Sequence, residues 1–261
     1  MKKGRAIGIC IVLLWGLVKL PMESAFAAKL QEHRFGGYKI TASLRQQAGQ
    51  AGFLAVLSGL RAMVADILWI RAHMAWEDRQ YPRMKLYFDA CTTLQPRREE
   101  FWDVASWHMA YNGSEFARTE MLRAGGDVIA SQREARRFFE IGEAYLLEGV
   151  RNCPDKWTLY DRLGMLYRDK FHDPCKAAHA YAEASRRPGR LDYTRRFAVY
   201  MLAECPGHER EAYEKLTALY NEGQHEWLPT LLAKIQILER KLGIPNDRRL
   251  YIPPQDRLPP D

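Results

Sequence analysis

The spacing of hydrophobic residues is the feature that most constrains what this chain can fold into. Along residues 53–76, apolar side chains recur every three or four positions, at Phe53, Val56, Leu57, Leu60, Val64, Ile67, Leu68, Trp69, Ala72, Ala75 and Trp76. This is the period of an α-helix with a buried face, whereas a half-buried strand would alternate every second residue. Hardly any segment past Ala28 shows that alternation, so we expect an all-α protein.

Glycine and proline punctuate the helical pattern at nearly every junction. Tyr81-Pro82 ends the first helix, and a second, from about Arg83 to Leu94, stops before Pro96 because a residue ahead of proline avoids helical geometry. Further helices are expected at about Arg98–Asn112, Asp127–Asn152, Lys156–Asp169, Pro174–Arg187, Leu191–Glu204, His208–Glu222 and Trp227–Leu242. The chain therefore consists of helix pairs joined by short turns.

One pair carries an internal repeat signature. Its residues are Tyr160-x-x-Leu163-Gly164-x-x-Tyr167, followed by Ala177, Tyr181, Ala184 and Pro188. With one extra residue in the intervening turn, this segment resembles a tetratricopeptide repeat (TPR). The resemblance implies a right-handed superhelix of stacked helix pairs, in which Gly164 and the alanines permit close helix approach and the aromatic rings fill the space between layers.

Other segments match the repeat pattern less well. An earlier unit ends at Phe88, Cys91 and Pro96, with Ala72 where glycine is usual, and the unit ending at Pro154 is more divergent. We therefore expect about three to four degenerate repeats in a TPR-like domain over residues 28–242. The Pro-rich residues 243–261 cannot continue a helix, and we expect an extended tail that is either free or packed along the last layer.

The first 27 residues have the composition of a secretory signal peptide. A basic start at residues 2–5 precedes an apolar run from Ala6 to Val18, and Ala25-Phe26-Ala27 offers small residues for cleavage. The run is shorter than the roughly 20 residues that span a bilayer. We favour cleavage after Ala27 over a retained N-terminal anchor, and either alternative places the body of the protein outside the cytoplasm, in the periplasm or on the inner membrane.

A second resemblance concerns the start of the first repeat. Gly59-x-Arg61-x-x-x-Ala65-Asp66-x-x-Trp69 is similar to a sequence near the beginning of a group of envelope-associated bacterial TPR proteins, most of them uncharacterised. It implies export and the repeat fold but no particular activity. Arg61 and Asp66 are unusual in an apolar helix. We favour a structural role in capping or bridging to a neighbouring helix over the alternative of a ligand contact.

Charge and motifs exclude several classes of function. Beyond residue 27 the chain holds 35 basic and 31 acidic side chains, and this dispersed excess does not predict nucleic-acid binding. The chain contains none of the common nucleotide-binding, serine-hydrolase or zinc-protease motifs. We therefore expect no enzyme, cofactor or metal, although carboxylates from separate helices could still converge, as in helical glycan-cleaving enzymes.

Three cysteines lie at predicted helix junctions, and Cys91 is expected to be a buried core residue. Cys175 and Cys205 fall in the turns inside consecutive repeats, so a disulfide between them is possible in an oxidising compartment. The nearby histidines leave a metal site open as an alternative, with His172, Cys175, His179, Cys205 and His208 as its candidate ligands. Unlinked cysteines are the third alternative.

The TPR resemblance also indicates where a partner would bind. In such superhelices the first helix of each pair lines the concave face, so the resemblance implies partner contacts by His73, Trp76, Asp161, Met165 and Arg168. Trp69 is more simply a packing residue, and Trp76 fits packing and binding equally well. The function that we expect is an exported protein–protein interaction scaffold or assembly factor of the bacterial cell envelope, in a secretion, pilus or surface-polymer system. The alternative is an envelope enzyme that acts on glycans.

Overall fold

The computed structural model describes residues 59–259 of the chain, and every regular element in this range is helical. The all-α prediction is therefore confirmed for the described residues. The chain divides into two compact units at the Pro96–Arg97 junction, and each is described by itself. The predicted signal peptide lies outside the described residues. Within them, no helix is both long enough and apolar enough to cross a membrane.

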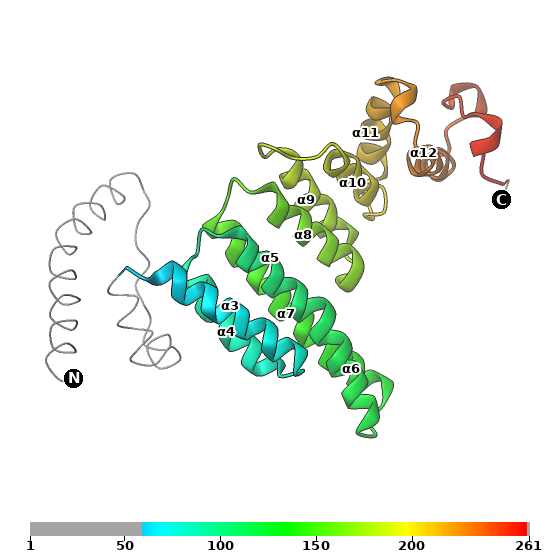
Figure 1. Ribbon diagram of the computed structural model, residues 1–261. Helices are drawn as coiled ribbons and strands as arrows, with labels where there is room; N and C mark the ends of the chain where they lie inside the picture. Colours follow the sequence, from blue (N-terminus) through cyan, green and yellow to red (C-terminus); the bar gives the residue numbers. More distant parts are fainter. Residues whose placement is uncertain (1–58, 260–261) are drawn as a thin grey trace, which may run out of the picture. The chain divides into compact units, whose positions relative to one another are not determined.

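The described part of the first unit is a hairpin of two helices, α3 (Arg61–Glu77) and α4 (Tyr81–Leu94), shown in cyan in Figure 1. Gly59 has a φ of 79°, which only glycine adopts readily, and α3 begins two residues later. The described part of the expected helix therefore starts at Arg61. The face of α3 toward α4 consists of small residues, Ala65, Ala72 and Ala75. They let the two backbones approach closely, as shown by the Cys91 thiol that donates to the Ala65 carbonyl at 3.3 Å.

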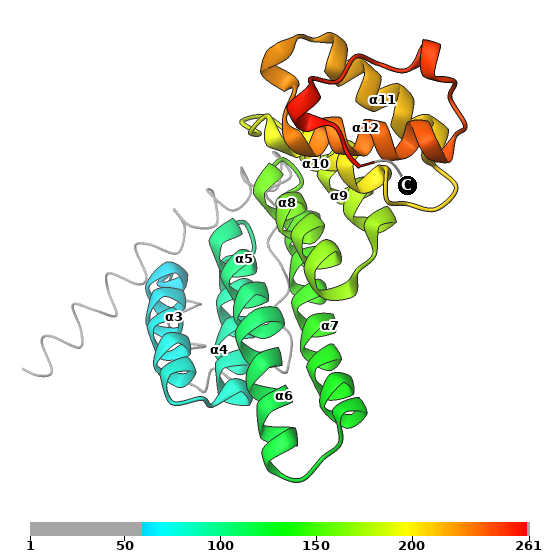
Figure 2. The same cartoon turned by 90° about the vertical axis from the view of Figure 1, so that its right-hand side faces the viewer.

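The second unit opens with a long antiparallel pair (Figures 1 and 2). Its first member is a continuous helical segment of α5 (Glu99–Trp107), the π-helical η1 (His108–Gly113) and α6 (Ser114–Arg123), and its second is α7 (Val128–Asn152). The prediction that this helix ends near Asn112 is wrong. Gly113 lies inside the segment because a Cβ there would be 2.6 Å from the Phe138 ring of α7, so its role is close packing rather than helix termination.

Shorter helices complete the second unit. They are α8 (Trp157–Leu166) with the π-helical η2 (Tyr167–Phe171), α9 (Pro174–Ser185), α10 (Tyr193–Leu202), α11 (Glu209–Asn221) and α12 (Pro229–Lys241), with 3-10 turns η3 (Gln224–Glu226), η4 (Asn246–Arg248) and η5 (Pro254–Asp256). Helix α9 packs against both α8 and α10. At the α8–α9 contact, a Cβ on Gly164 would lie 2.8 Å from the Tyr181 ring. This glycine therefore permits the close approach expected from its place in the repeat pattern.

A disulfide joins two turns of the second unit. The Cys175 and Cys205 sulfurs are 2.01 Å apart, and their Cα atoms are 4.9 Å apart. Cys175 lies at the start of α9, and Cys205 lies between α10 and α11, so the bond connects the inner turns of consecutive helix pairs. Of the three alternatives for these cysteines, the structure has the disulfide. The other cysteines of the described residues, Cys91 and Cys153, are buried and form no disulfide with a described residue.

The Pro-rich C-terminal segment lies along α12. Gln236 of α12 donates to the Asp256 carbonyl at 2.9 Å and accepts from the Leu258 amide at 2.8 Å. Glu239 accepts a hydrogen bond from the Leu250 amide at 2.8 Å, and the Ile252 side chain is buried. Of the two alternatives for the tail, the structure has the packed one, which covers the last helix.

Candidate functional site

One hollow of the second unit lies between α5 and α8. Its lining residues are Asp103, Val104, Trp107, Arg162 and Met165, and its volume is about 370 Å³. We call it the α5–α8 groove. Each of the two helices is the first member of its pair, and they lie next to each other in Figures 1 and 2. The groove is thus built from the same kind of helix that the TPR resemblance assigns to partner binding.

Trp107 forms the exposed wall of the groove. Its side chain is 43% exposed, although tryptophan is a residue that folded proteins usually bury for most of its surface. The ring stacks on Tyr111, with centroids 4.2 Å apart and an angle of 15° between the planes. Leu146 and Leu166 line a small adjoining hollow that also contacts Trp107. Stacking on one side holds the indole in place and leaves apolar surface open on the other.

An ion pair crosses the groove from one helix to the other. The Arg162 Nε donates to Asp103 Oδ1 at 3.0 Å, and Arg162 Nη1 lies 3.2 Å from the Met165 sulfur. Burial raises the pKa of Asp103 above its ordinary value, and the neighbouring Arg162 guanidinium opposes this shift. Both side chains are partly exposed, so the pair offers a negative and a positive group to a ligand.

The two π-helical segments meet at one end of the groove. The Tyr111 hydroxyl of η1 donates to Asp169 Oδ2 of η2 at 3.4 Å, and this contact and burial both raise the pKa of Tyr111. The Lys170 Nζ lies over the Tyr111 ring, 4.6 Å from its centroid. Since π-helical turns inside α-helices are frequent at functional sites, their position beside the groove supports a functional role.

Two of the residues predicted for partner contacts, Met165 and Arg168, lie on the accessible part of α8 and η2. Met165 lines the groove. Arg168 pairs with Asp169 at 2.6 Å and lies over the Phe197 ring of α10, 5.3 Å from its centroid. Met165 therefore contacts the groove directly, whereas Arg168 fills the space between α8 and α10.

Asp161 does not lie on an open face. Its side chain is only 3% exposed, and the Tyr193 hydroxyl of α10 lies close enough to influence its pKa. Burial raises the pKa of Asp161, and its Oδ1 has no hydrogen-bond partner among the described residues. The expectation that this carboxylate faces a partner is therefore corrected: α10 covers it.

The other two predicted residues belong to the first unit. His73 is half-buried, with its Nδ1 2.9 Å from the Trp69 carbonyl and its ring against Trp69 and Phe88. These contacts are those of a packing residue. Trp76 is 37% exposed near the end of α3.

Sequence reasoning missed the α5 side of the groove, namely Asp103, Val104 and Trp107, and it also missed Tyr111 of η1, on which Trp107 stacks. The available signal was the helix expected at Arg98–Asn112, which is the first member of its pair. Its repeat departs furthest from the consensus, so no position on it was aligned with the binding face.

The described residues contain one cluster with metal-ligand side chains, formed by Glu222, His225 and Glu226 within 4.8 Å of one another. Its buried member, Glu226, already accepts hydrogen bonds from Arg195 at 3.4 Å and Arg196 at 3.2 Å. Arg195 also pairs with Glu222. Two guanidinium groups neutralise the carboxylates, so the cluster is explained as an ion-pair network between α10 and η3.

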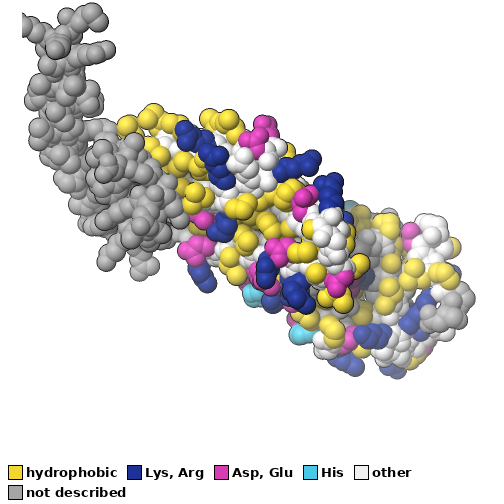
Figure 3. All heavy atoms as spheres, turned by 90° about the horizontal axis from the view of Figure 1, so that it is seen from below, with side chains coloured by type: hydrophobic (Ala, Val, Ile, Leu, Met, Phe, Trp, Pro, Cys, Tyr) yellow, Lys and Arg dark blue, Asp and Glu magenta, His cyan; other side chains and the backbone are white. Residues whose placement is uncertain are grey.

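One face of the described part of the molecule carries mixed charge. On the face seen in Figure 3, hydrophobic, basic and acidic side chains alternate, and no large field of one sign is visible on the described part of that face. No protein-family model matches the chain, and no curated protein or solved structure is significantly similar to it. The candidate function therefore rests on the chemistry of the α5–α8 groove.

Proposed function

We propose that this protein is an exported scaffold that binds a segment of another cell-envelope protein in the α5–α8 groove. The observation that carries the proposal is the half-exposed Trp107, fixed by its stacking on Tyr111 and facing Met165 and Val104. Tryptophan and arginine dominate binding energies when they line a pocket from which a partner excludes water. The groove has both.

The groove suits a peptide with one apolar anchor side chain flanked by polar ones. Its volume of about 370 Å³ is at the lower end for small-molecule pockets, which run from roughly 300 to 1,000 Å³. Asp103 and Arg162 can exchange hydrogen bonds with peptide groups while remaining paired. An apolar anchor would pack against Trp107 and Met165.

Two observations support a TPR-like stacking of the helix pairs. Gly164 and Tyr181 make the close contact that the repeat pattern requires, and the disulfide joins equivalent turns of consecutive pairs. Export is supported by the signal-like first 27 residues and by that disulfide, since disulfides persist in oxidising compartments.

Affinity capture from the native envelope tests this function. The wild-type chain, a Trp107→Ala variant and an Ile129→Ala variant would each be tagged and used to recover bound proteins. Ile129 is 66% exposed and lies outside the groove, so its variant controls for the general loss of surface hydrophobicity. A partner should be recovered with wild type and with the Ile129 variant, but not with the Trp107 variant. Equal recovery by all three chains would contradict the groove as the binding site.

The alternative is an enzyme that acts on envelope glycans. The pKa values of Asp103 and Asp161 are both raised by burial, as a general acid at neutral pH requires. Arg162 lies beside both carboxylates and favours their ionised forms. Incubation of the chain with envelope glycans distinguishes the alternatives: cleavage that is abolished by Asp103→Asn would favour the enzyme.

A further inference from the structure

Helix α3 of the first unit is apolar on two opposite faces. Its buried alanines face α4, whereas its larger hydrophobic residues point outward and are 42–60% exposed; these are Leu60, Met63, Ile67, Ile70 and Met74. We call these five residues the α3 stripe. Because successive residues turn by about 100°, the stripe lies on the side of α3 opposite Ala65 and Ala72. A helix with apolar residues on both sides is normally covered on both.

The spacing of the α3 stripe identifies what kind of surface covers it. The intervals between its members are three, four, three and four residues, which is the heptad pattern of a two-stranded coiled coil. Leu60, Ile67 and Met74 occupy the a positions, and Met63 and Ile70 occupy the d positions. Such a seam is self-complementary, because a second copy presents the same residues in the same register.

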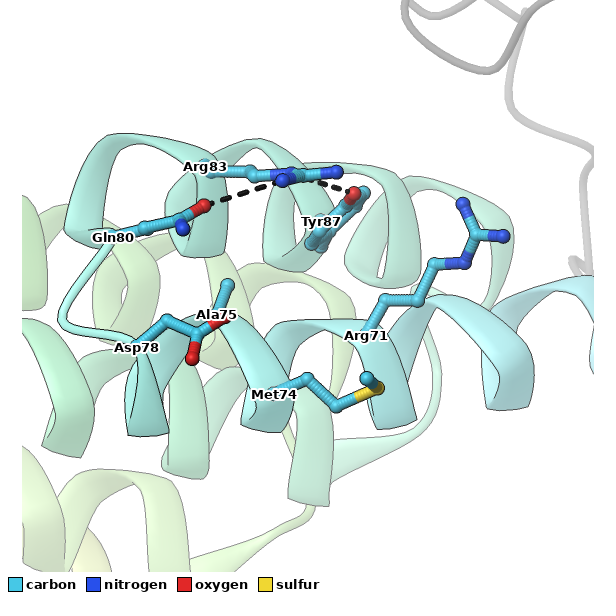
Figure 4. A pocket seen from close by; sticks show the side chains of 7 residues that line it. All are labelled: Arg71, Met74, Ala75, Asp78, Gln80, Arg83 and Tyr87. Atoms are coloured by element: carbon cyan, nitrogen blue, oxygen red, sulfur yellow. Dashed lines mark hydrogen bonds between the residues drawn. The ribbon is translucent and has the colours of Figure 1, made fainter.

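The charges beside the stripe select a parallel arrangement of two helices. Asp66 occupies a g position and Arg71 the e position of the next heptad, and in a parallel coiled coil these positions face each other across the seam. Both residues are exposed. Arg71 makes no ion pair with any described residue, and Figure 4 shows its guanidinium extended away from the other side chains of the hollow between α3 and α4.

We propose that the α3 stripe is a self-association surface, on which two copies of this chain pack α3 against α3 in parallel and in register. The dimer contains two Asp66–Arg71 pairs, one on each side of the seam. A lipid surface is a poorer occupant, because helices that lie on anionic membranes carry a basic polar face, whereas the acidic Asp66 and Glu77 of α3 balance the basic Arg61 and Arg71.

The length of the helix sets the strength of the association. With 17 residues, α3 is about 25 Å long, and its contact with a second copy falls in the class of interfaces below roughly 1,200 Å². Such interfaces are typically weak, so the dimer should form with a dissociation constant in the micromolar range and dissociate on dilution.

Analytical ultracentrifugation of the full chain tests the proposal, over concentrations from about 1 to about 500 µM, which bracket a weak interface. The wild type should pass from monomer to dimer. An Ile67→Glu, Ile70→Glu variant buries two charges at the seam and should weaken association by more than about tenfold. Asp66→Lys and Arg71→Glu should each weaken it about threefold, and their combination should restore it. The matched control is Ile129→Glu, which changes an isoleucine outside the stripe that is 66% exposed.

Cross-linking tests the orientation. A chain carrying Ile67→Cys should form a covalent dimer on mild oxidation, because position 67 faces itself in a parallel pair, whereas Ile129→Cys should not. A wild type that stays monomeric throughout would overturn the proposal. The proposal would also be overturned if the Ile67→Glu, Ile70→Glu variant melted at a lower temperature than wild type at concentrations where both proteins are monomeric. That result would mean that another part of the same chain covers the stripe. Binding to phosphatidylglycerol vesicles by a chain that remains monomeric would also overturn it.

Discussion

Removing the disulfide between Cys175 and Cys205 should lower the stability of the second unit by a predictable amount. The bond links residues 30 positions apart, and the loop that it closes contains α9 and α10. A cross-link stabilises a protein chiefly because it restricts the unfolded chain. The loop-entropy relation gives about 3.6 kcal/mol for a loop of this length at 25 °C.

This magnitude converts into a large shift of the melting temperature. For a domain of 150–250 residues, each kcal/mol corresponds to roughly 2–4 °C, so a Cys175→Ser, Cys205→Ser variant should melt about 7–14 °C below wild type. Thermal unfolding followed by far-ultraviolet circular dichroism measures the shift. Reductant provides the matched control: it should lower the melting temperature of wild type to that of the variant and leave the variant unchanged.

Mass spectrometry under the same conditions tests the linkage itself. On reduction the intact wild-type chain should gain the mass of two hydrogen atoms, and the double-serine variant should gain none. An unchanged wild-type mass, together with a loss of stability below about 1 kcal/mol in the variant, would refute the idea that this bond ties the two helix pairs together.

Three further predictions concern single side chains. Gly164→Ala places a methyl group 2.8 Å from the Tyr181 ring. The resulting strain should exceed the gain in helix propensity and lower the free energy of unfolding by about 1–2 kcal/mol in urea titrations. Adding Tyr181→Leu to the same chain should recover part of that loss, and losses that simply add would contradict the contact. Arg162→Ala removes the guanidinium that opposes the rise in the Asp103 pKa caused by burial. The pKa of Asp103 should therefore rise further, as measured by carbon-detected NMR titration. An unchanged pKa would show that the ion pair is not formed. Hydrogen bonds from Lys241 and the Gly207 amide lower the pKa of Glu209 from 4.5 to about 2. The contribution of Glu209 to stability is therefore present above pH 4.5 and is lost as the pH falls through 2. Glu209→Gln should lower the melting temperature at pH 7 but not below pH 2, and a difference that is constant with pH would contradict this assignment.

The helices could be predicted because their signals are local. Apolar spacing and proline positions placed one helix at Asp127–Asn152, and the structure has it at Val128–Asn152. The failure at Gly113 has a physical reason. Glycine is a common helix terminator, but here it sits mid-helix to admit the Phe138 ring, and that ring comes from a different helix. Local sequence does not distinguish the two roles.

The candidate site was less predictable because it depends on contacts between helices. Asp161 occupies a position that the repeat pattern assigns to the binding face, yet Tyr193 of α10 covers it. Trp107 is one of seven tryptophans in the chain, and only its position at the edge of the α5–α8 groove separates it from those that pack in the interior. Both facts depend on how neighbouring pairs stack, which the spacing within one pair does not reveal.

Photo-crosslinking from inside the groove tests the central claim most directly. A photoreactive amino acid would be placed at position 165 or, as a matched control, at position 129, and the chain irradiated in its native envelope. We predict that position 165, which lies beside Trp107, crosslinks to a partner protein and that Trp107→Ala in the same chain abolishes the product. Crosslinks that form equally from both positions, or that persist without Trp107, would contradict partner binding in the α5–α8 groove.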